Sequence, residues 1–210
     1  MRVEAKRLWW SASLFVLLAA GGLIGLDRTI ALWTAGGARG SIWDQGTRVL
    51  DLLTLKDLSN FLLGALLLAS AAALIALRRT RRIGWPVLYL ALVQALATVA
   101  ADLSKPPFGR LRPFEAEAAG NIDSWFVGAN SFPSGHVAFY AGLFFPLAVL
   151  LPRWAALWML PPLFVAVARV IENDHYLSDV AASLALASAL AAALSPLARR
   201  GRAPTGEIAG

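Results

Sequence analysis

The sequence of 210 residues contains no cysteine, only two histidines, and a charged fraction of only 15%. Without cysteine the chain can form neither a disulfide nor a thiolate nucleophile, and it lacks the commonest soft ligands of structural zinc. Two histidines argue against a histidine-rich metal site. Soluble domains are usually about one quarter charged, so the chain fits that class poorly. We therefore expect a membrane protein that uses neither a metal nor another cofactor.

Hydrophobic residues make up 58% of the chain and gather in six apolar stretches. The predicted spans are residues 8–26, 59–77, 83–101, 136–151, 154–171 and 180–198. Four of them reach 19 uncharged residues, close to the roughly 20 that a helix needs to cross a bilayer. The fourth and fifth are shorter, and a pair of re-entrant helices is their alternative. The predicted fold is a single-domain, all-α integral membrane protein with six transmembrane helices.

Two segments leave alternatives open. The first apolar stretch could be a cleaved signal peptide, although such a peptide has a shorter apolar core of about 7 to 15 residues. Residues 27–58 mix apolar and charged side chains, which predicts an amphipathic, interfacial helix between the first and second spans, with Trp43 at headgroup depth. A helix packed over the end of the bundle fits this segment equally well.

The distribution of charge predicts the sidedness of the protein. With a cytoplasmic N-terminus and six crossings, the inner segments hold 11 Lys or Arg and 2 acidic residues, whereas the outer segments hold 8 and 11. Lys and Arg concentrate in cytoplasmic loops, so this orientation is preferred and explains the net charge of +6 without a nucleic-acid partner. Residues 199–210 are then a flexible cytoplasmic tail.

Both histidines lie in polar segments on the predicted outer side. His175 and Asp179 are four residues apart, a spacing that brings two side chains to one face of a helix. A carboxylate on one imidazole nitrogen fixes the tautomer and leaves the other nitrogen free as a nucleophile or base. Arg169 ends an apolar stretch, where an ionisable residue is costly. A structural histidine beside a helix-start aspartate, and an arginine that reaches the headgroups, are the alternatives.

His136 follows a turn that opens an apolar helix. The first N–H groups of a helix lack partners within it and bind anions, and Gly135 permits close approach. Ser134 can act as the N-cap or as a phosphate donor. Upstream, Lys105, Arg110 and Arg112 place three cations within eight residues, although such a run can also be a lipid-facing basic patch. Fixed cations, an anion-binding helix start and two imidazoles suit phosphoryl transfer without a metal.

These segments resemble the three signature motifs of the type 2 phosphatidic acid phosphatase superfamily, Lys-x6-Arg-Pro, Pro-Ser-Gly-His and Ser-Arg-x5-His-x3-Asp. The matching residues are Lys105, Arg112 and Pro113, then Pro133 to His136, then Arg169, His175 and Asp179. One position departs from the pattern, because Ala168 stands where the family usually has serine. The six-helix layout is similar to that of the bacterial membrane members.

The resemblance implies a metal-independent phosphatase in which His175 is the nucleophile, Asp179 orients it and His136 protonates the leaving group. Lys105, Arg112, Arg169 and the Ser134 and Gly135 region would hold the phosphoryl oxygens. The expected partners are the bilayer and a lipid phosphate such as phosphatidic acid, phosphatidylglycerophosphate, undecaprenyl diphosphate or lipid A, at the outer face of the inner membrane. A lipid phosphotransferase with the same site, or a transporter or flippase for an anionic lipid, is the alternative. The sequence does not indicate an oligomeric state.

Overall fold

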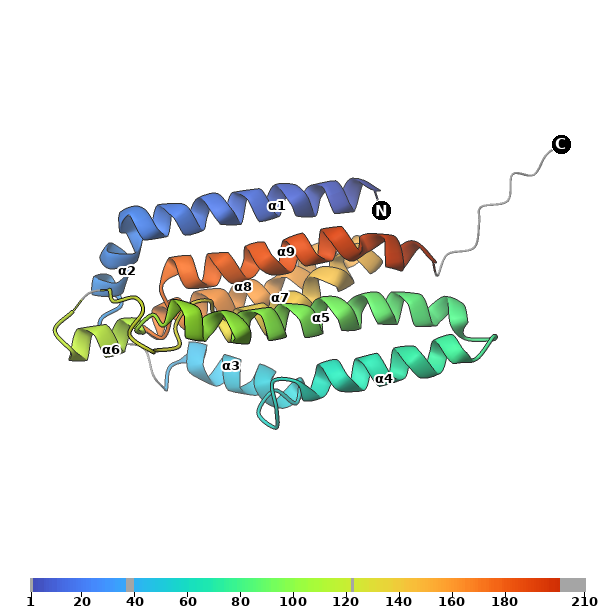
Figure 1. Ribbon diagram of the computed structural model, residues 1–210, viewed down its shortest axis with the longest axis horizontal. Coiled ribbons are helices and arrows are strands. Elements are labelled where there is room, and N and C mark those ends of the chain that lie inside the picture. Colours follow the sequence, from blue (N-terminus) through green and yellow to red (C-terminus); the bar gives the residue numbers. More distant parts are fainter. Residues whose placement is uncertain (1, 37–39, 122, 201–210) are drawn as a thin grey trace.

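The computed structural model describes residues 2–36, 40–121 and 123–200, and within these ranges the chain forms helices, turns and loops without any strand (Figure 1). In chain order the elements are α1 (Arg2–Gly21), a π-helical turn (Gly22–Leu26), α2 (Asp27–Trp33), α3 (Ile42–Leu53), α4 (Leu62–Ala76), α5 (Arg81–Phe108), α6 (Pro113–Ala118), α7 (Gly135–Leu150), a 3₁₀ turn (Pro152–Trp154), α8 (Ala155–Ile171) and α9 (Leu177–Arg200). The prediction of an all-α protein is confirmed for this part of the chain.

Four helical segments are long and apolar enough to cross a membrane. They are Ala5–Trp33, Arg81–Ala118, Pro152–Ile171 and Leu177–Arg200. The helices α4 and α7 are apolar but shorter. At 1.5 Å per residue a helix of 15 or 16 residues extends only roughly 23 Å, less than the ~30 Å hydrocarbon core. The count of six crossings therefore stays a prediction.

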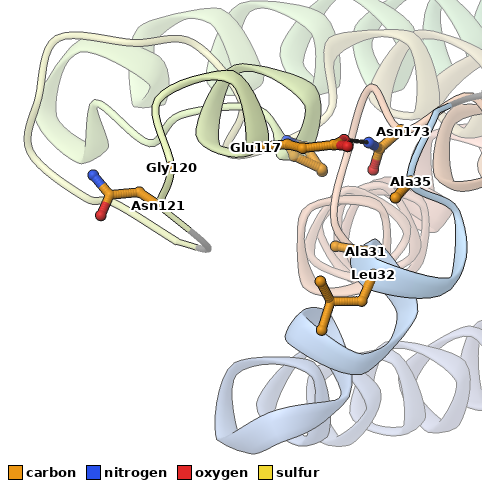
Figure 2. Close-up of a pocket in the computed structure, with 8 residues that line it drawn as sticks. Ala31, Leu32, Ala35, Glu117, Gly120, Asn121 and Asn173 are labelled. Carbon is orange, nitrogen blue, oxygen red and sulfur yellow. Dashed lines mark hydrogen bonds between the residues drawn. The ribbon is translucent and has the colours of Figure 1, made fainter.

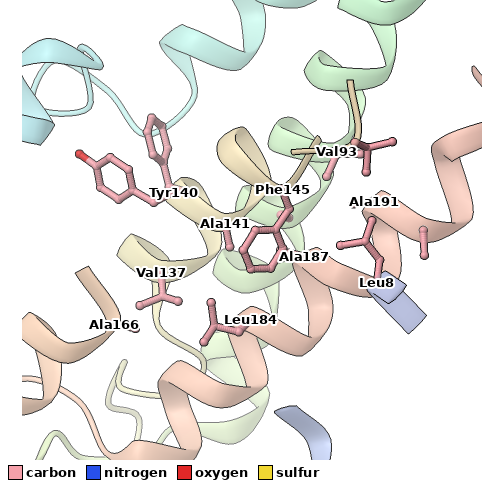
Figure 3. Packing of buried hydrophobic residues seen from close by; sticks show 14 of the residues in the cluster. Leu8, Val93, Val137, Tyr140, Ala141, Phe145, Ala166, Leu184, Ala187 and Ala191 are labelled. Atoms are coloured by element: carbon pink, nitrogen blue, oxygen red, sulfur yellow. The ribbon is translucent and has the colours of Figure 1, made fainter. Parts of the chain in front are cut away.

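Helix α9 packs against α1, α5 and α7. Most of its buried residues are alanine or serine, and small side chains let helices in a membrane approach one another closely. Figure 3 shows Leu184, Ala187 and Ala191 of α9 in the same apolar cluster as Ala141 and Phe145 of α7. The helix that begins beside His175 is thus held on three sides by the bundle.

Large apolar side chains also cover the outside of the bundle. Leu17, Ile24, Leu103 and Leu160 are all exposed, with 87% of Ile24 accessible. A soluble monomer rarely exposes so much apolar surface, whereas lipid tails cover such a surface without cost. The outer surface therefore agrees with the predicted membrane environment.

The first helical segment runs past its predicted end at Leu26. It kinks at Gly25 and continues as α2 to Trp33. Asp27 does not end the helix because its carboxylate is buried and forms an ion pair with Arg110 at 2.7 Å. A buried charge is tolerated when it is paired in this way, and the pairing partner lies 83 residues away in the sequence.

Helix α5 also runs past its predicted end at residue 101. It continues through Pro106 and Pro107 to Phe108, and it stops at Gly109, whose φ of +51° and N–H bond to the Lys105 carbonyl form a left-handed C-cap. Lys105 therefore lies on the last turn of a helix and not in the predicted loop. Helix α9 continues to Arg200, and the predicted tail from residue 201 on lies outside the described residues.

The predicted amphipathic helix in the 27–58 segment corresponds to α3. Its polar residues Thr47 and Asp51 are buried against the bundle, whereas Ile42, Leu52 and Leu53 are at least 69% exposed. The Trp43 ring stacks on Phe164 of α8 with centroids 5.2 Å apart. This orientation would suit a helix whose apolar face meets lipid, and its position at a membrane interface stays a prediction.

Candidate active site

The three sequence motifs meet at one end of the bundle, where α5 ends, α7 begins and α8 leads into α9 (Figure 1). The backbone N–H of Ser134 donates to the carbonyl of Asp179 at 3.3 Å, which ties the second motif to the third. A Cβ placed on Gly135 would lie 3.1 Å from the Lys105 Nζ, so the first motif approaches the second closely. All eight predicted site residues belong to segments of this one region.

His175 and Asp179 form a buried pair, with the imidazole Nδ1 3.4 Å from the carboxylate Oδ2. The two residues do not lie on one helix, because α9 begins only at Leu177 and His175 precedes it. Asp179 lies in the first turn of α9 and also accepts the backbone N–H of Tyr176 at 3.0 Å. The contact is therefore made by the turn into α9, and it leaves Nε2 as the second ring nitrogen.

Burial lowers the pKa of His175 below its ordinary value, and it outweighs the neighbouring Asp179 carboxylate, which acts to raise that pKa. A neutral imidazole keeps a lone pair on one nitrogen, and a nucleophile needs that lone pair. The surroundings of His175 thus favour the form that can attack an electrophile.

Two further side chains fix Asp179, and the sequence predicted neither of these contacts. The Ser131 hydroxyl donates to Oδ2 at 2.5 Å, and Nη1 of Arg110 donates to Oδ1 at 2.6 Å. Both carboxylate oxygens are therefore held by donors in addition to His175. Ser131 stands two residues before the second motif, and nothing in the sequence indicates that it contacts the third motif.

Arg110 is fully buried and pairs with three carboxylates. Its partners are Asp179, Asp27 at 2.7 Å and Asp123 at 2.9 Å. The guanidinium also lies over the ring of Tyr176, with Cζ 3.8 Å from the centroid. The sequence pattern groups Arg110 with the cations of a phosphate site, but in the structure its charge is directed at these three carboxylates, of which Asp27 and Asp179 are buried.

At the start of α7, Ser134 is the N-cap, and its hydroxyl accepts the N–H of Val137 at 3.5 Å. The Lys105 ammonium pairs with Asp102 at 2.6 Å and lies beside Gly135. A helix start and an ammonium group attract the same kind of ligand, an anion. Any larger residue than glycine at position 135 would crowd the Lys105 ammonium.

Arg112 and Arg169 line a polar pocket of about 420 Å³ together with Gly40, Asp44, Arg48, Phe114, Glu172 and Asp174. Arg169 forms ion pairs with Glu172 and, at 2.9 Å, with Asp174, and Arg112 lies 3.9 Å from Asp174. Burial raises the pKa of Glu172 to about 7, against the opposing effect of Arg169. The two arginines are thus brought together as predicted, but each has a carboxylate beside it.

His136 occupies the second position of α7, and its Nε2 lies 3.2 Å from Asp51 of α3. Ala168 is buried in α8, and its methyl group supplies no hydroxyl to the site. The sequence did not predict a partner for His136, because Asp51 lies 85 residues earlier in a segment that matches none of the three motifs.

Other pockets lie outside this cluster, and two of them are close to it in the sequence. Figure 2 shows a pocket of about 240 Å³ between α2 and α6, where Glu117 accepts a hydrogen bond from Asn173 at 3.2 Å. Of the motif residues only Pro113 lines it. An apolar groove of about 350 Å³ runs between α1, α8 and α9. Within the described ranges, no three His, Asp or Glu side chains are grouped so as to hold a metal ion.

Known proteins are similar to this chain in sequence and in fold. A lipid A 1-phosphatase from Rhizobium etli is 31% identical over 107 residues, which cover 49% of this chain and 46% of that protein. A lipid A 1-phosphatase from Rhizobium johnstonii is also 31% identical over 107 residues, which cover 49% of this chain and 44% of that protein. The match thus spans a little under half the length of these curated relatives.

The crystal structure of a transmembrane PAP2-type phosphatidylglycerolphosphate phosphatase from Bacillus subtilis superposes with a TM-score of 0.52 over 92% of this chain and 94% of that chain, at 20% identity. This likeness and the four candidate spans support an integral membrane protein. The sequence model of the PAP2 superfamily matches residues 86–202, which is more than half of the chain and includes all three motifs. The chain therefore belongs to the PAP2 superfamily.

Proposed function

We propose that this protein hydrolyses the phosphate monoester or diphosphate of a membrane lipid through a phosphohistidine on His175. The observation that carries the proposal is the buried His175–Asp179 pair, whose carboxylate is held on both oxygens by Ser131 and Arg110. A nucleophile oriented this firmly can attack in line without reorganisation. Family membership and the lipid phosphatase relatives support the same activity.

In the first step Nε2 of His175 attacks the phosphorus, the bond from phosphorus to the lipid oxygen breaks, and His136 gives that oxygen a proton. In the second step His136 takes a proton from water, the water oxygen bonds to phosphorus, and the bond from phosphorus to His175 breaks. Phosphate leaves and both imidazoles return to their starting forms. Lys105, Arg112, Arg169 and the α7 start at Ser134 and Gly135 are proposed to hold the phosphoryl oxygens, since fixed positive charge stabilises the transition state.

The apolar groove between α1, α8 and α9 is the proposed place for a lipid chain. Its lining includes Ile171 and Leu177, which flank the segment that carries His175, and its other walls are Phe15, Leu163 and Val180. A chain in this groove would keep its contact with lipid while the headgroup meets the polar pocket. Ala181→Trp in the groove wall should therefore reduce turnover of a long-chain lipid phosphate far more than turnover of a water-soluble aryl phosphate.

The substrate is best identified by phosphate release from purified protein in detergent. The panel should contain phosphatidic acid, phosphatidylglycerophosphate, undecaprenyl diphosphate and a lipid A phosphate, of which the Rhizobium relatives favour the last. Added lipid acceptors distinguish hydrolysis from phosphotransfer, because a transferase would form a new phospholipid in place of free phosphate. No release from any lipid would contradict the proposal.

Activity is expected to survive excess chelator, because Lys and Arg side chains supply the positive charge around the phosphate. A loss that magnesium restores would refute the metal-independent step. The site is expected on the outer face of the inner membrane, with both termini in the cytoplasm. Since the chain has no cysteine, a single Glu117→Cys substitution gives a unique label site. This cysteine should react with an impermeant reagent in intact cells. Reaction only after lysis would show that the site faces the cytoplasm, opposite to the proposed orientation.

A further inference from the structure

We propose that Asp51 of α3 is the positioning residue of His136 and that it supplies the negative charge that keeps the proton on this imidazole until the lipid leaving group takes it. The inference rests on the proposed function and adds a residue to it. Asp51 precedes residue 86, so it lies outside the part of the chain that the superfamily model matches.

The contact between Asp51 and His136 belongs to a network of hydrogen bonds between α3 and α7. Oδ2 of Asp51 lies 3.2 Å from His136 Nε2, while Oδ1 accepts the Tyr140 hydroxyl at 2.7 Å. The Tyr140 hydroxyl is 3.2 Å from the Thr54 hydroxyl, which closes the chain of contacts back to α3. Figure 3 shows the Tyr140 hydroxyl pointing away from the labelled apolar core residues. Each carboxylate oxygen thus has its own partner on α7.

The orientation of α3 depends on this contact. Asp51 is a buried carboxylate on a helix whose opposite, apolar face is exposed. Burial acts to raise the pKa of Asp51, but the hydrogen bonds of His136 and Tyr140 outweigh it and keep the pKa below its ordinary value. Asp51 is therefore an anion, and a buried anion is stable only while a donor or cation faces it.

The other charges around His136 are positive. The pKa of His136 is lowered to about 4, first by burial and then by Lys56, in the turn after α3, and Arg169, in the last turn of α8. The hydrogen bond and the charge of Asp51 act to raise that pKa, while Lys56 and Tyr140 act on Asp51 itself. Burial and the two cations thus work against a general acid, and Asp51 is the group that opposes them. Pairing at Nε2 leaves Nδ1 for proton exchange with the substrate.

The turn that carries Lys56 is itself held in an unusual conformation. Leu55 has a φ of +59°, which is rare for a residue other than glycine and is kept only where the surroundings fix it. The backbone bonds from Leu55 to Leu52 and from Lys56 to Asp51 hold this turn. The turn therefore holds Lys56 in place near His136, and the negative charge of Asp51 opposes the positive charge of Lys56 there.

Two substrates with different leaving groups test the proposal. A lipid phosphate releases an alkoxide that needs a proton, whereas p-nitrophenyl phosphate releases a stable phenolate that does not. Asp51→Asn should lower kcat/KM for the lipid phosphate roughly 10- to 100-fold, a part of the roughly 10²- to 10⁴-fold that general acid catalysis contributes, because His136 itself stays in place. The same variant should change kcat/KM for the aryl phosphate less than threefold. Equal losses on both substrates would show a merely structural role and overturn the proposal.

The pH dependence gives a second readout. Removing an anion beside an imidazole lowers its pKa, by roughly one unit or more at contact distance. The group that must carry a proton then loses it at lower pH, so the alkaline limb of the profile should move to lower pH in Asp51→Asn. Asp51→Glu should restore part of the limb. Asp57→Asn removes an exposed carboxylate from the same segment and should leave the limb unchanged.

A titration without turnover separates this proposal from the proposed function. The chain has two histidines, so NMR of imidazole-labelled protein gives two signals, which His136→Ala assigns. Asp51→Asn should lower the His136 midpoint by about one pH unit and leave His175 unchanged. An unchanged His136 midpoint would overturn the inference even if the enzyme is a phosphatase. If Asp51→Asn does not fold, Asp51→Ser removes the same charge with a smaller side chain and should shift the His136 midpoint in the same direction, and the absence of that shift has the same meaning.

Discussion

The two histidines of this chain each meet an aspartate, but the two pairs are built differently. In the His175–Asp179 pair the side chains are 3% and 0% exposed. In the His136–Asp51 pair they are 30% and 9% exposed. Asp179 is held by Ser131, Arg110 and a backbone N–H besides its histidine. Asp51 has one further side-chain donor, Tyr140.

This difference matches two chemical tasks. A nucleophile must be neutral and fixed in direction, and dense donors around Asp179 together with burial provide both conditions. A general acid must exchange its proton with the leaving group and later with water, so it needs access. The half-exposed His136 on the first turn of α7 has that access. The variants below either remove this contrast or measure how large it is.

The largest expected effect is the loss of the proposed nucleophile, His175. His175→Ala should abolish phosphate release, a loss of about 10⁴-fold or more by analogy with other covalent catalysts. It should also abolish the acid-labile phosphoenzyme that radiolabelled substrate leaves on the wild type. His136→Ala should still form this phosphoenzyme from an aryl phosphate, because that leaving group needs no proton. A phosphoenzyme in His175→Ala but none in His136→Ala would exchange the two roles.

The second effect concerns Arg110, which pairs with Asp179 of the His175–Asp179 pair. Arg110→Met leaves Asp27, Asp123 and Asp179 without their shared cation, and removing one partner of a buried charge pair costs about 3–5 kcal/mol of unfolding free energy. Thermal or denaturant unfolding in detergent measures this loss. Arg48→Met is the matched control, since Arg48 pairs with Asp44 at a side-chain exposure of 76%. Such an exposed ion pair contributes little to stability because water screens it, so equal losses would contradict the assignment.

A smaller effect is expected from the hydroxyl on Asp179. Ser131→Ala removes the 2.5 Å hydrogen bond to Oδ2 and leaves Arg110 and His175 in place. We expect a fall in kcat of roughly tenfold, the value of one hydrogen bond to a charged group, with little change in KM. Ser188→Ala is the control, because the buried Ser188 hydroxyl has no hydrogen-bond partner. An equal fall in both variants would indicate general loosening of the core.

Much of the His175 side of this comparison followed from the sequence. The predicted topology placed the segments of Lys105, Gly135 and Asp179 on one side of the membrane, and in the structure these segments meet at one end of the helical bundle. The reason is local, since each motif stands at an end of an apolar stretch, and the ends of neighbouring helices meet. Their functional roles remain predictions, as does the number of crossings.

The partners that hold these residues did not follow from the sequence. Asp27 and Asp51 belong to none of the three motifs. The packing of α2 on the bundle brings Asp27 to Arg110, and the packing of α3 brings Asp51 to His136. Two helix ends were also predicted too early. The first helical segment continues beyond Asp27, whose charge is neutralised in a buried ion pair, and α5 continues through Pro106 and Pro107 and ends at Gly109. Long-range pairing of charges overrode local signals in these places.

The smallest expected effect lies in the polar pocket that Arg112 and Arg169 line. Glu172 pairs with Arg169, one of its oxygens is buried without a hydrogen-bond partner, and burial raises its pKa to about 7. Because this pKa is raised, the carboxyl is neutral below pH 6 and charged above pH 8. A charged Glu172 repels a phosphate at Arg169. Glu172→Gln should therefore bind phosphate more tightly, but only at high pH.

Inhibition by inorganic phosphate measures this effect as the ratio of the wild-type Ki to the variant Ki across pH, which cancels the titration of phosphate itself. The ratio should rise from about one at pH 6 to roughly fivefold at pH 8.5, since one nearby charge contributes on the order of 1 kcal/mol in a partly solvated site. Glu117→Gln is the control, because Glu117 accepts from Asn173 and does not pair with Arg169. A ratio that stays constant with pH would show that phosphate binds away from Arg169, and the proposed phosphate site would have to move toward Lys105 and the start of α7.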